Sequence, residues 1–278
     1  MAHYLVSREK GEKETKMEYR YKLGFLGAGN MAKAIANGII KSNILKADEV
    51  VMSDPFVTGE VSGIKVINDN SVIFNDCEYV LLAIKPQVFN QIVDELKETK
   101  VKNVISIMAG VKMAKIKSVL PNACVIRIMP NLPASVGAGM AGIAKDNDAS
   151  KEANEFTKAV FDSVGKAIFV NESDLDAVTA ISGSGPAYVY YFIQSMIKAG
   201  INNGLTEEQA KELTLQTFVG AVEMVKHSTD NLDIMIDRVC SKGGTTIQAI
   251  DTFRGYNLDD KIIEGINKCK LRSEELSK

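Results

Sequence analysis

A glycine-rich motif close to the start of the sequence has the composition and spacing to bind a phosphate group. Gly27, Gly29 and Ala32 follow the pattern G-x-G-x-x-A, after an apolar run and before a stretch of helical spacing. In such a motif the first glycine permits a tight turn, and the second lets the backbone approach a pyrophosphate. The N–H groups at the start of the helix then face the anion. With a strand before it and a helix after it, the motif favours dinucleotide binding over a purely structural turn.

An acidic residue stands at the distance expected for the ribose of such a cofactor. Asp54 follows the third motif position by 22 residues, at the end of the next predicted strand. A carboxylate there can accept hydrogen bonds from both adenosine ribose hydroxyls and would repel a 2′-phosphate. Because Pro55 and Phe56 follow where an arginine could have bound a phosphate, the sequence leans to NADH over NADPH, although Ser53 or Lys65 could still serve a phosphate. The alternative is that Asp54 only caps an Asp-Pro turn.

Further segments of small residues and prolines are candidates for loops around a ligand. Ligands of open α/β sheets bind at the carboxyl ends of the strands, and four of these segments are predicted to lie there. A fifth lies in the later, helical part of the chain. Taken singly, each segment is typical of an ordinary turn. The five segments are 83–87, 106–111, 127–134, 182–187 and 241–246.

The elements that must position these loops alternate between short apolar runs and helical stretches up to residue 170. The runs are rich in Val, Ile and Leu, which is typical of strands buried on both faces. The alternation indicates an α/β protein with a doubly wound, mostly parallel sheet, and short links leave room for an antiparallel pair at its edge. The predicted strands are 22–26, 49–52, 64–67, 79–84, 103–107, 124–128, 140–144 and 167–170, and the predicted helices are 30–41, 71–75, 87–98, 113–119 and 150–164.

From residue 173 onward the strand signal stops and helix signals replace it. Thr206 and Gln209 have the spacing of a capping box, and apolar residues follow at helical intervals. Further helices are predicted over 232–240, 246–253 and 258–276. We therefore divide the chain into a polar extension (1–20), a dinucleotide-binding domain (21–172) and a helical domain (173–278). A helical unit of roughly 100 residues is marginal alone, so we expect its apolar faces to pack against a second copy rather than only on the first domain.

Composition excludes several classes of protein. The formal net charge of −2 gives no electrostatic footprint for nucleic acid or an anionic membrane. The longest apolar runs are far shorter than the roughly 18 residues of a membrane span. Four scattered cysteines without CxxC spacing argue against a structural zinc site or a disulfide scaffold, and favour a reducing cytoplasm. Residues 1–20 alternate in charge and have no apolar block, so we expect a flexible polar extension in place of a secretory signal, with Met17 as an alternative start.

In order and spacing, these segments closely resemble the pyrroline-5-carboxylate reductases over residues 22–275. The most specific marks are SGSGPAY at 182–188 and GGTT at 243–246. The resemblance implies an N-terminal Rossmann-type domain and a helical C-terminal domain that intertwines with a partner into a homodimer, often within a ring of dimers. It also implies hydride transfer from NAD(P)H to the imine carbon of L-1-pyrroline-5-carboxylate, which gives L-proline in the last step of proline biosynthesis.

The same resemblance implies roles for individual positions. The pyrophosphate loop would be Gly27, Ala28, Gly29, Asn30 and Met31, and Asn70 would contact the adenosine ribose. The nicotinamide half would lie beside Ala83, Lys85, Pro86, Met108, Ala109 and Gly110. The substrate carboxylate would be held by Ser241, Gly243, Gly244, Thr245 and Thr246. Two positions depart from the family pattern: Lys242 stands where proline is usual, and Leu132 where threonine is usual.

We expect positioning to carry much of the catalysis, because a protonated imine is already electrophilic. Thr246 is the expected hydroxyl beside the ring nitrogen, as a hydrogen-bond partner or a relay to water. No metal site is predicted, since His227 has no second histidine near it, and Arg127 and Arg238 are expected in ion pairs. Two alternatives remain: a related imine or 3-hydroxy-acid reductase on the same two-domain plan, and a dinucleotide-binding redox sensor that is not an enzyme.

Overall fold

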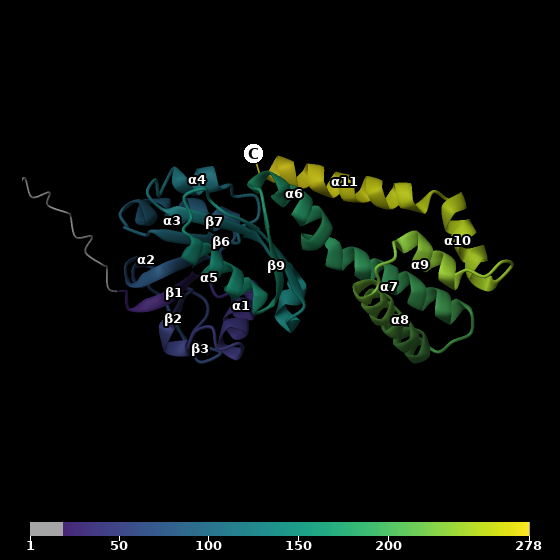
Figure 1. The fold of residues 1–278 in the computed structure, drawn as a ribbon. Coiled ribbons are helices and arrows are strands. Elements are labelled where there is room, and N and C mark those ends of the chain that lie inside the picture. Colours follow the sequence, from purple (N-terminus) through teal and green to yellow (C-terminus); the bar gives the residue numbers. More distant parts are fainter. Residues whose placement is uncertain (1–18, 278) are drawn as a thin grey trace, which may run out of the picture.

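The computed structural model describes residues 19–277, which form a sheet half and a helical half (Figure 1). The polar extension predicted for residues 1–20 lies outside the described residues, apart from Tyr19 and Arg20, as do His3 and Met17. Among the helices of the described part, none is both long and apolar enough to cross a membrane.

The sheet half contains nine strands within residues 19–277, one more than the sequence predicts. The strands are β1 (Tyr21–Leu26), β2 (Val50–Ser53), β3 (Glu60–Val61), β4 (Ile64–Ile67), β5 (Cys77–Leu82), β6 (Asn103–Ser106), β7 (Cys124–Met129), β8 (Gly139–Ala144) and β9 (Gly165–Val170). Their order in the sheet is β3-β4-β2-β1-β5-β6-β7-β8-β9. The additional strand β3 pairs antiparallel with β4. Ser62 and Gly63 between them have φ of 54° and 79°, as a two-residue hairpin turn requires.

The strand order reverses at β1, which is the point that positions the site. β1 pairs in parallel with β2 on one side and with β5 on the other. In open α/β sheets, ligands bind in the crevice at the carboxyl ends of the strands where the order reverses. An antiparallel pair does occur among the last strands, because β7 and β8 run in opposite directions, but it lies one strand in from the predicted edge position: β8 pairs in parallel with the edge strand β9. The prediction of a mostly parallel, doubly wound sheet is confirmed.

Helices cover both faces of this sheet, and each face has its own apolar core. They are α1 (Asn30–Lys41), α2 (Asn70–Asp76), α3 (Pro86–Lys97), α4 (Met113–Lys117) and α5 (Lys151–Asp162). On one face, Ile35 and Ile39 of α1 pack with Phe161 of α5. On the other, Phe89 of α3 and Ile116 of α4 pack together. The two cores fix the glycine motif, at the start of α1, against the centre of the sheet.

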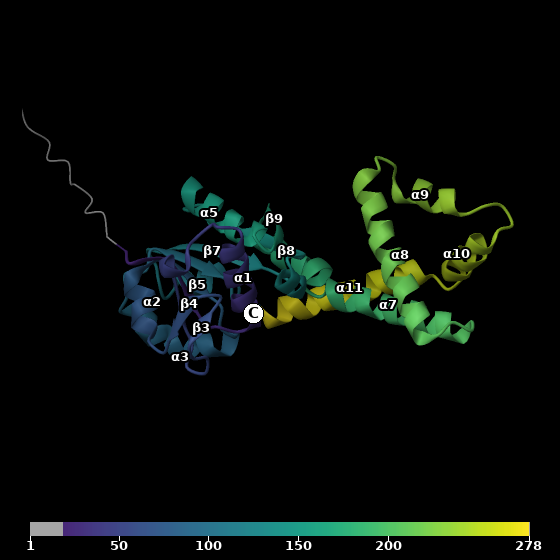
Figure 2. The ribbon, with the colours of Figure 1, turned by 90° about the horizontal axis from the view of Figure 1, so that it is seen from below.

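After β9 the chain is helical. The helices are α6 (Leu175–Val178), the π-helical turn η4 (Thr179–Gly183), α7 (Gly185–Asn202), α8 (Glu207–His227), α9 (Leu232–Val239), α10 (Thr245–Gly255) and α11 (Leu258–Leu276). In both views α7 leads away from the sheet and α11 returns to it, so that the end of α11 lies at the junction of the two halves (Figures 1 and 2). The predicted domain boundary at 172/173 falls between β9 and α6.

One predicted position is wrong in this region. The segment 182–187 was expected at the carboxyl end of a strand, but it spans the junction of η4 and α7. Its glycines and prolines suit that junction equally well, because Pro186 occupies the first turn of α7, where its missing N–H is no loss. The segment still meets a strand-end loop in space: the Asn131 side chain donates to the Ser182 carbonyl oxygen at 3.0 Å.

The helical half leaves large apolar faces uncovered. Described residues of α7, α9, α10 and α11 include no buried side chain, and α8 buries only Ala210 and Thr214. Tyr191, Leu213 and Val239 are among the large apolar side chains that stay exposed. Since these faces do not pack on the sheet half, they are available to a second copy, as the sequence predicts.

Candidate functional site

The first glycine of the motif is required by the turn itself. Gly27 has φ of +101°, a conformation that L side chains rarely adopt, and a Cβ there would stand 2.8 Å from the Ala83 carbonyl oxygen. Its N–H donates to the Ser53 carbonyl oxygen at 2.8 Å, which holds the loop against β2. The predicted tight turn is therefore confirmed for this residue.

The second glycine has a different reason to be small. Gly29 is extended, with φ of −71° and ψ of −179°, so any residue could adopt its conformation. Within the described part of the chain, no atom lies within 4 Å of the place where its Cβ would stand. As the N-cap of α1 it offers no side-chain acceptor, which leaves the first N–H groups of the helix to an external acceptor. An anion fits this position well, because the helix N-terminus carries partial positive charge.

Asp54 is bound directly to the glycine motif. Its Oδ2 accepts a hydrogen bond from the Ala28 N–H at 2.8 Å, across 26 residues of sequence. Its Oδ1 accepts from the N–H groups of Phe56 and Val57, at 2.8 and 3.2 Å. The alternative that Asp54 caps its own loop is therefore confirmed. Contact with a cofactor ribose stays a prediction, and Asp54 stands beside the loop where that contact would form.

Asn70 lies at the first position of α2 and is held toward the same edge of the sheet. Its side-chain oxygen accepts from the Ser53 hydroxyl at 2.8 Å, and its side-chain nitrogen donates to Glu95 at 3.1 Å. Ser53 is the last residue of β2 and immediately precedes Asp54. The structure thus gathers the residues predicted for the adenosine half of a dinucleotide around the end of β2.

The residues predicted for the nicotinamide half follow β5 and β6. The Ala83 N–H donates to the Leu26 carbonyl oxygen at 2.9 Å, so the end of β5 is tied to the end of β1. Lys85 is the N-cap of α3, and Pro86 is the first residue of that helix. Met108 is buried, whereas Ala109 is exposed. All of the predicted cofactor residues therefore lie at or just beyond the carboxyl ends of the parallel strands, on both sides of β1.

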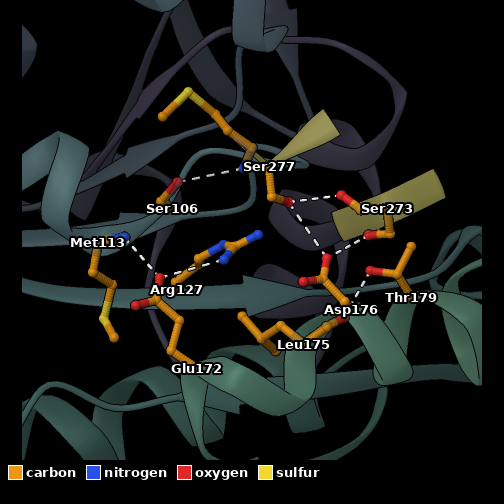
Figure 3. A network of polar contacts seen from close by, with 10 residues as sticks. Ser106, Met113, Arg127, Glu172, Leu175, Asp176, Thr179, Ser273 and Ser277 are labelled. Atoms are coloured by element: carbon orange, nitrogen blue, oxygen red, sulfur yellow. Dashed lines mark hydrogen bonds and ion pairs between the residues drawn. The ribbon is translucent and has the colours of Figure 1, made fainter. Parts of the chain in front are cut away.

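The end of α11 packs on the loop after β6, which no sequence motif indicates. Gly110 has φ of +74°, and a Cβ there would stand 2.9 Å from the Leu276 carbonyl oxygen. Figure 3 shows how this end is held: the hydroxyls of Ser273 and Ser277 both donate to the Asp176 carboxylate, at 2.6 and 3.4 Å. The last turn of the chain thereby connects α6 to the loop predicted to lie near the nicotinamide.

An ion pair joins the sheet to the segment that leads into the helical half. Arg127 of β7 is buried, and its guanidinium lies 3.3 Å from Glu172 Oε1, which also accepts from the Met113 N–H at 2.7 Å (Figure 3). Arg238 pairs with Asp230. The prediction that both arginines form ion pairs is confirmed.

The residues predicted to hold the substrate, 241–246, are called the substrate corner. They lie at a second helix N-terminus, that of α10. Gly243 has φ of +71°, and Gly244 is the N-cap of α10, with its N–H donating to the Ser241 carbonyl oxygen at 2.9 Å. The first turn of α10 contains no acidic side chain. Thr246 is half-buried, and its neighbour Thr245 is exposed. The first backbone N–H groups of α10 and the side chain of Ser241 lie close together here, as a site for a small carboxylate would need.

The cofactor loop, which is the glycine motif at residues 27–31, and the substrate corner do not face each other within one chain. Both views place α10 at the outer end of the helical half, away from α1 (Figures 1 and 2). The 18 residues of α7 separate these regions, and a helix of that length spans roughly 27 Å. A single copy therefore does not bring the residues predicted to hold the substrate to the residues predicted to bind the cofactor.

Other reactive groups are poorly placed for catalysis. Burial raises the pKa of the Cys77 thiol to about 12 and that of the Cys124 thiol to about 11, which keeps both protonated at neutral pH. Across residues 19–277, no three His, Cys, Asp or Glu side chains come together as a possible metal site.

Comparison with known proteins relates both halves of the chain to one kind of enzyme. Residues 172–276 match the model "Pyrroline-5-carboxylate reductase dimerisation", and residues 22–110 match "NADP oxidoreductase coenzyme F420-dependent". The pyrroline-5-carboxylate reductase of Synechocystis is 36% identical over 92% of this chain and 98% of its own length. That of Methanosarcina acetivorans is 35% identical over the same shares.

A solved structure extends this likeness to three dimensions. The Plasmodium falciparum pyrroline carboxylate reductase with NADP bound superposes with a TM-score of 0.85 and is 31% identical, covering 94% of this chain and all of that one. Sequence identity and fold agree over nearly the whole length, including the glycine motif and the helical half. The chain therefore belongs to the pyrroline-5-carboxylate reductase family.

Proposed function

We propose that the protein reduces L-1-pyrroline-5-carboxylate to L-proline with NAD(P)H, the last step of proline biosynthesis. The observation that carries the proposal is that both family models fall on the sites built above: one covers the glycine motif and the other covers the corner at residues 241–246. Addition of pyrroline-5-carboxylate to the protein and reduced cofactor should consume the cofactor and form proline in equal amounts. A reduced cofactor that survives the addition would contradict the proposal.

The cofactor would lie across the edge of the sheet at β1 and, when bound, supply the hydride. Its pyrophosphate would occupy the open space over Gly29 at the start of α1, and its adenosine ribose would lie beside Asp54 and Asn70, which are both held near the end of β2. The nicotinamide half would lie beside Ala83, Lys85, Pro86, Met108, Ala109 and Gly110. In this proposal these residues bind and orient the cofactor, which suits a reaction that depends on placing a hydride near an electrophilic carbon.

The substrate would be held by the corner of α10. The N–H groups of Thr245 and Thr246 at the start of α10, together with the hydroxyls of Ser241 and Thr245, can bind its carboxylate without an arginine. Lys242 is exposed in the same loop and adds a positive charge near that anion. Thr246 would place its hydroxyl against the ring nitrogen, where a proton must be retained as the imine becomes an amine.

Thr246→Ala should lower kcat/KM for pyrroline-5-carboxylate by about 10-fold, equivalent to about 1.4 kcal/mol, because one hydrogen bond to a charged group is lost. The matched control is Thr252→Ala, two turns later on α10, whose hydroxyl donates to the Gln248 carbonyl oxygen at 2.7 Å within the helix. Steady-state kinetics should separate the two variants. Equal efficiencies for T246A and the unmodified protein would remove Thr246 from the reaction.

Asp54→Ser should raise the ratio of NADPH to NADH efficiency by about 10-fold, since a carboxylate repels a 2′-phosphate and binds the ribose hydroxyls. Loss of the Ala28 and Phe56 contacts weakens the loop for both cofactors alike. The ratio of the two kcat/KM values therefore isolates the ribose effect from the loop effect. An unchanged ratio, with both efficiencies lowered, would leave Asp54 as a loop cap alone.

The helical half is a dimerisation domain, and we infer that the partner subunit completes each site. Its α10 corner would face the cofactor loop of the first copy, which resolves the separation seen within one chain. The exposed apolar faces of α7 and α8 supply the surface for such an intertwined contact. A ring of dimers, a cytoplasmic location and the domain boundary at 172/173 belong to the same proposal. The four free cysteines fit a reducing compartment.

A further inference from the structure

Phe56 is exposed to an unusual degree for a phenylalanine. Its side chain is 93% exposed, although it stands two residues after Asp54, next to the loop predicted to bind the cofactor. Four other phenylalanines of the sheet half are buried: Phe25, Phe74, Phe89 and Phe161. A large aromatic ring in water at a binding edge is a surface that a ligand can cover.

The backbone of the loop that carries this ring is held by hydrogen bonds and packing. The Phe56 N–H donates to Asp54 Oδ1 at 2.8 Å, and the next N–H donates to the same oxygen. Pro55 restricts the backbone before it, and Val57 packs on the apolar core after it. The backbone that carries the ring is thus anchored on both sides, so little backbone conformational entropy is lost when a ligand contacts the ring.

Asp54 also sets where the ring stands relative to the glycine motif. One carboxylate oxygen binds the Ala28 N–H and the other binds the Phe56 N–H, so a single side chain connects the pyrophosphate loop to the aromatic residue. Along a dinucleotide, the base lies beyond the ribose as seen from the pyrophosphate. A residue just past the predicted ribose contact is therefore placed to meet the base.

We propose that Phe56 stacks on the adenine base of the dinucleotide, an inference that rests on the proposed function. Every base presents a flat aromatic face, and a phenylalanine ring can cover that face without a specific hydrogen bond. Phe56 would act on affinity for the adenosine half of NADH and NADPH alike. It would leave binding of the nicotinamide half and the hydride step unchanged.

Calorimetric titration of the full-length dimer with cofactor fragments tests this role. Phe56→Ala should weaken ADP-ribose binding by about 10-fold, within the range measured for base–aromatic stacking, and leave nicotinamide mononucleotide binding unchanged. Phe169→Ala, which removes a partly exposed ring from the distant edge strand β9, is the matched control and should change neither. Unaltered ADP-ribose affinity in F56A would overturn the proposal.

A second readout needs no loss of binding. The sequence contains no tryptophan, so Phe56→Trp introduces a single tryptophan that can be excited apart from the tyrosines, and its emission should fall when ADP-ribose saturates the site. Tryptophan emission in F56W that does not change at saturating ADP-ribose would also contradict stacking. Dissociation of the dimer in F56A would contradict it as well, because the ring would then be an interface residue. Pyrroline-5-carboxylate reduction by the unmodified protein is measured separately, so failure of the stacking proposal is distinct from failure of the proposed function.

Discussion

Gly29→Val should weaken cofactor binding by at least about 100-fold, or about 2.7 kcal/mol, without unfolding the protein. The extended backbone at Gly29 accepts any residue, and the described structure leaves open space around its Cβ position. A branched side chain there would occupy the space that we assign to the pyrophosphate. It would also hold the phosphate away from the first N–H groups of α1, so the effect falls on the ligand rather than on the fold.

A comparison with Gly27, two residues earlier, separates an effect on cofactor binding from an effect on folding. Gly27→Ala should lower the free energy of unfolding by several kcal/mol, because φ of +101° and the Ala83 carbonyl oxygen 2.8 Å away both oppose a Cβ. Gly29→Val should keep a midpoint of thermal unfolding close to that of the unmodified protein, apart from a small effect at the N-cap. Calorimetry with NADH and NADPH measures the binding. Undiminished affinity in G29V would place the pyrophosphate elsewhere.

The sheet was predictable because its signal is local and repeated. The buried parts of β1 and β5 are nearly continuous apolar runs, interrupted by charge only near their first residues, and burial on both faces requires that composition. The two-residue strand β3 was missed, since Glu60 and Val61 are too few to show an alternation. Its signal lay in the turn: Ser62 and Gly63 both take positive φ, as a two-residue hairpin demands.

The contacts around the predicted cofactor residues, and those that join the sheet to the helical half, could not be predicted, because they connect residues far apart in sequence. Neither the pairing of Asp54 with Ala28 nor that of Arg127 with Glu172 has a local pattern. Gly110 looked like a turn glycine, but its place against the end of α11 depends on the path of the helical half. Motifs identify which residues take part, whereas packing decides which of them meet.

That distinction matters most for the substrate corner. The family resemblance implies that residues 241–246 hold a substrate against the cofactor, yet within one chain α7 carries them to the far end of the helical half (Figure 1). Both sites are built like anion sites, each at a helix N-terminus entered by glycines. We propose that these two half-sites, which lie on one elongated chain with an uncovered apolar surface between them, form a whole site when a second copy supplies the missing half.

Mixed dimers of two inactive variants should therefore recover activity. Gly29→Val removes cofactor binding, and Thr245→Glu places a carboxylate against the substrate carboxylate. The glutamate suits the helix itself, since a negative charge is favourable at the N-terminus of α10. In a two-fold dimer with shared sites, each hybrid of one G29V chain and one T245E chain contains one intact site. With equal, freely exchanged chains, about a quarter of all sites should be intact, and reduction of pyrroline-5-carboxylate should recover to that level.

The alternative arrangement gives the opposite result, which makes the mixing experiment decisive. If loop and corner acted within one chain, every site in the hybrid would carry one damaged half, and the mixture would stay as inactive as its parents. Native mass spectrometry with a mass tag on one variant confirms that chains have exchanged. As a control, G29V mixed with the double variant G29V/T245E should exchange equally well and recover nothing, because no chain in that mixture brings an intact cofactor loop. Activity in the first mixture and none in the second would assign the two halves of each site to different subunits.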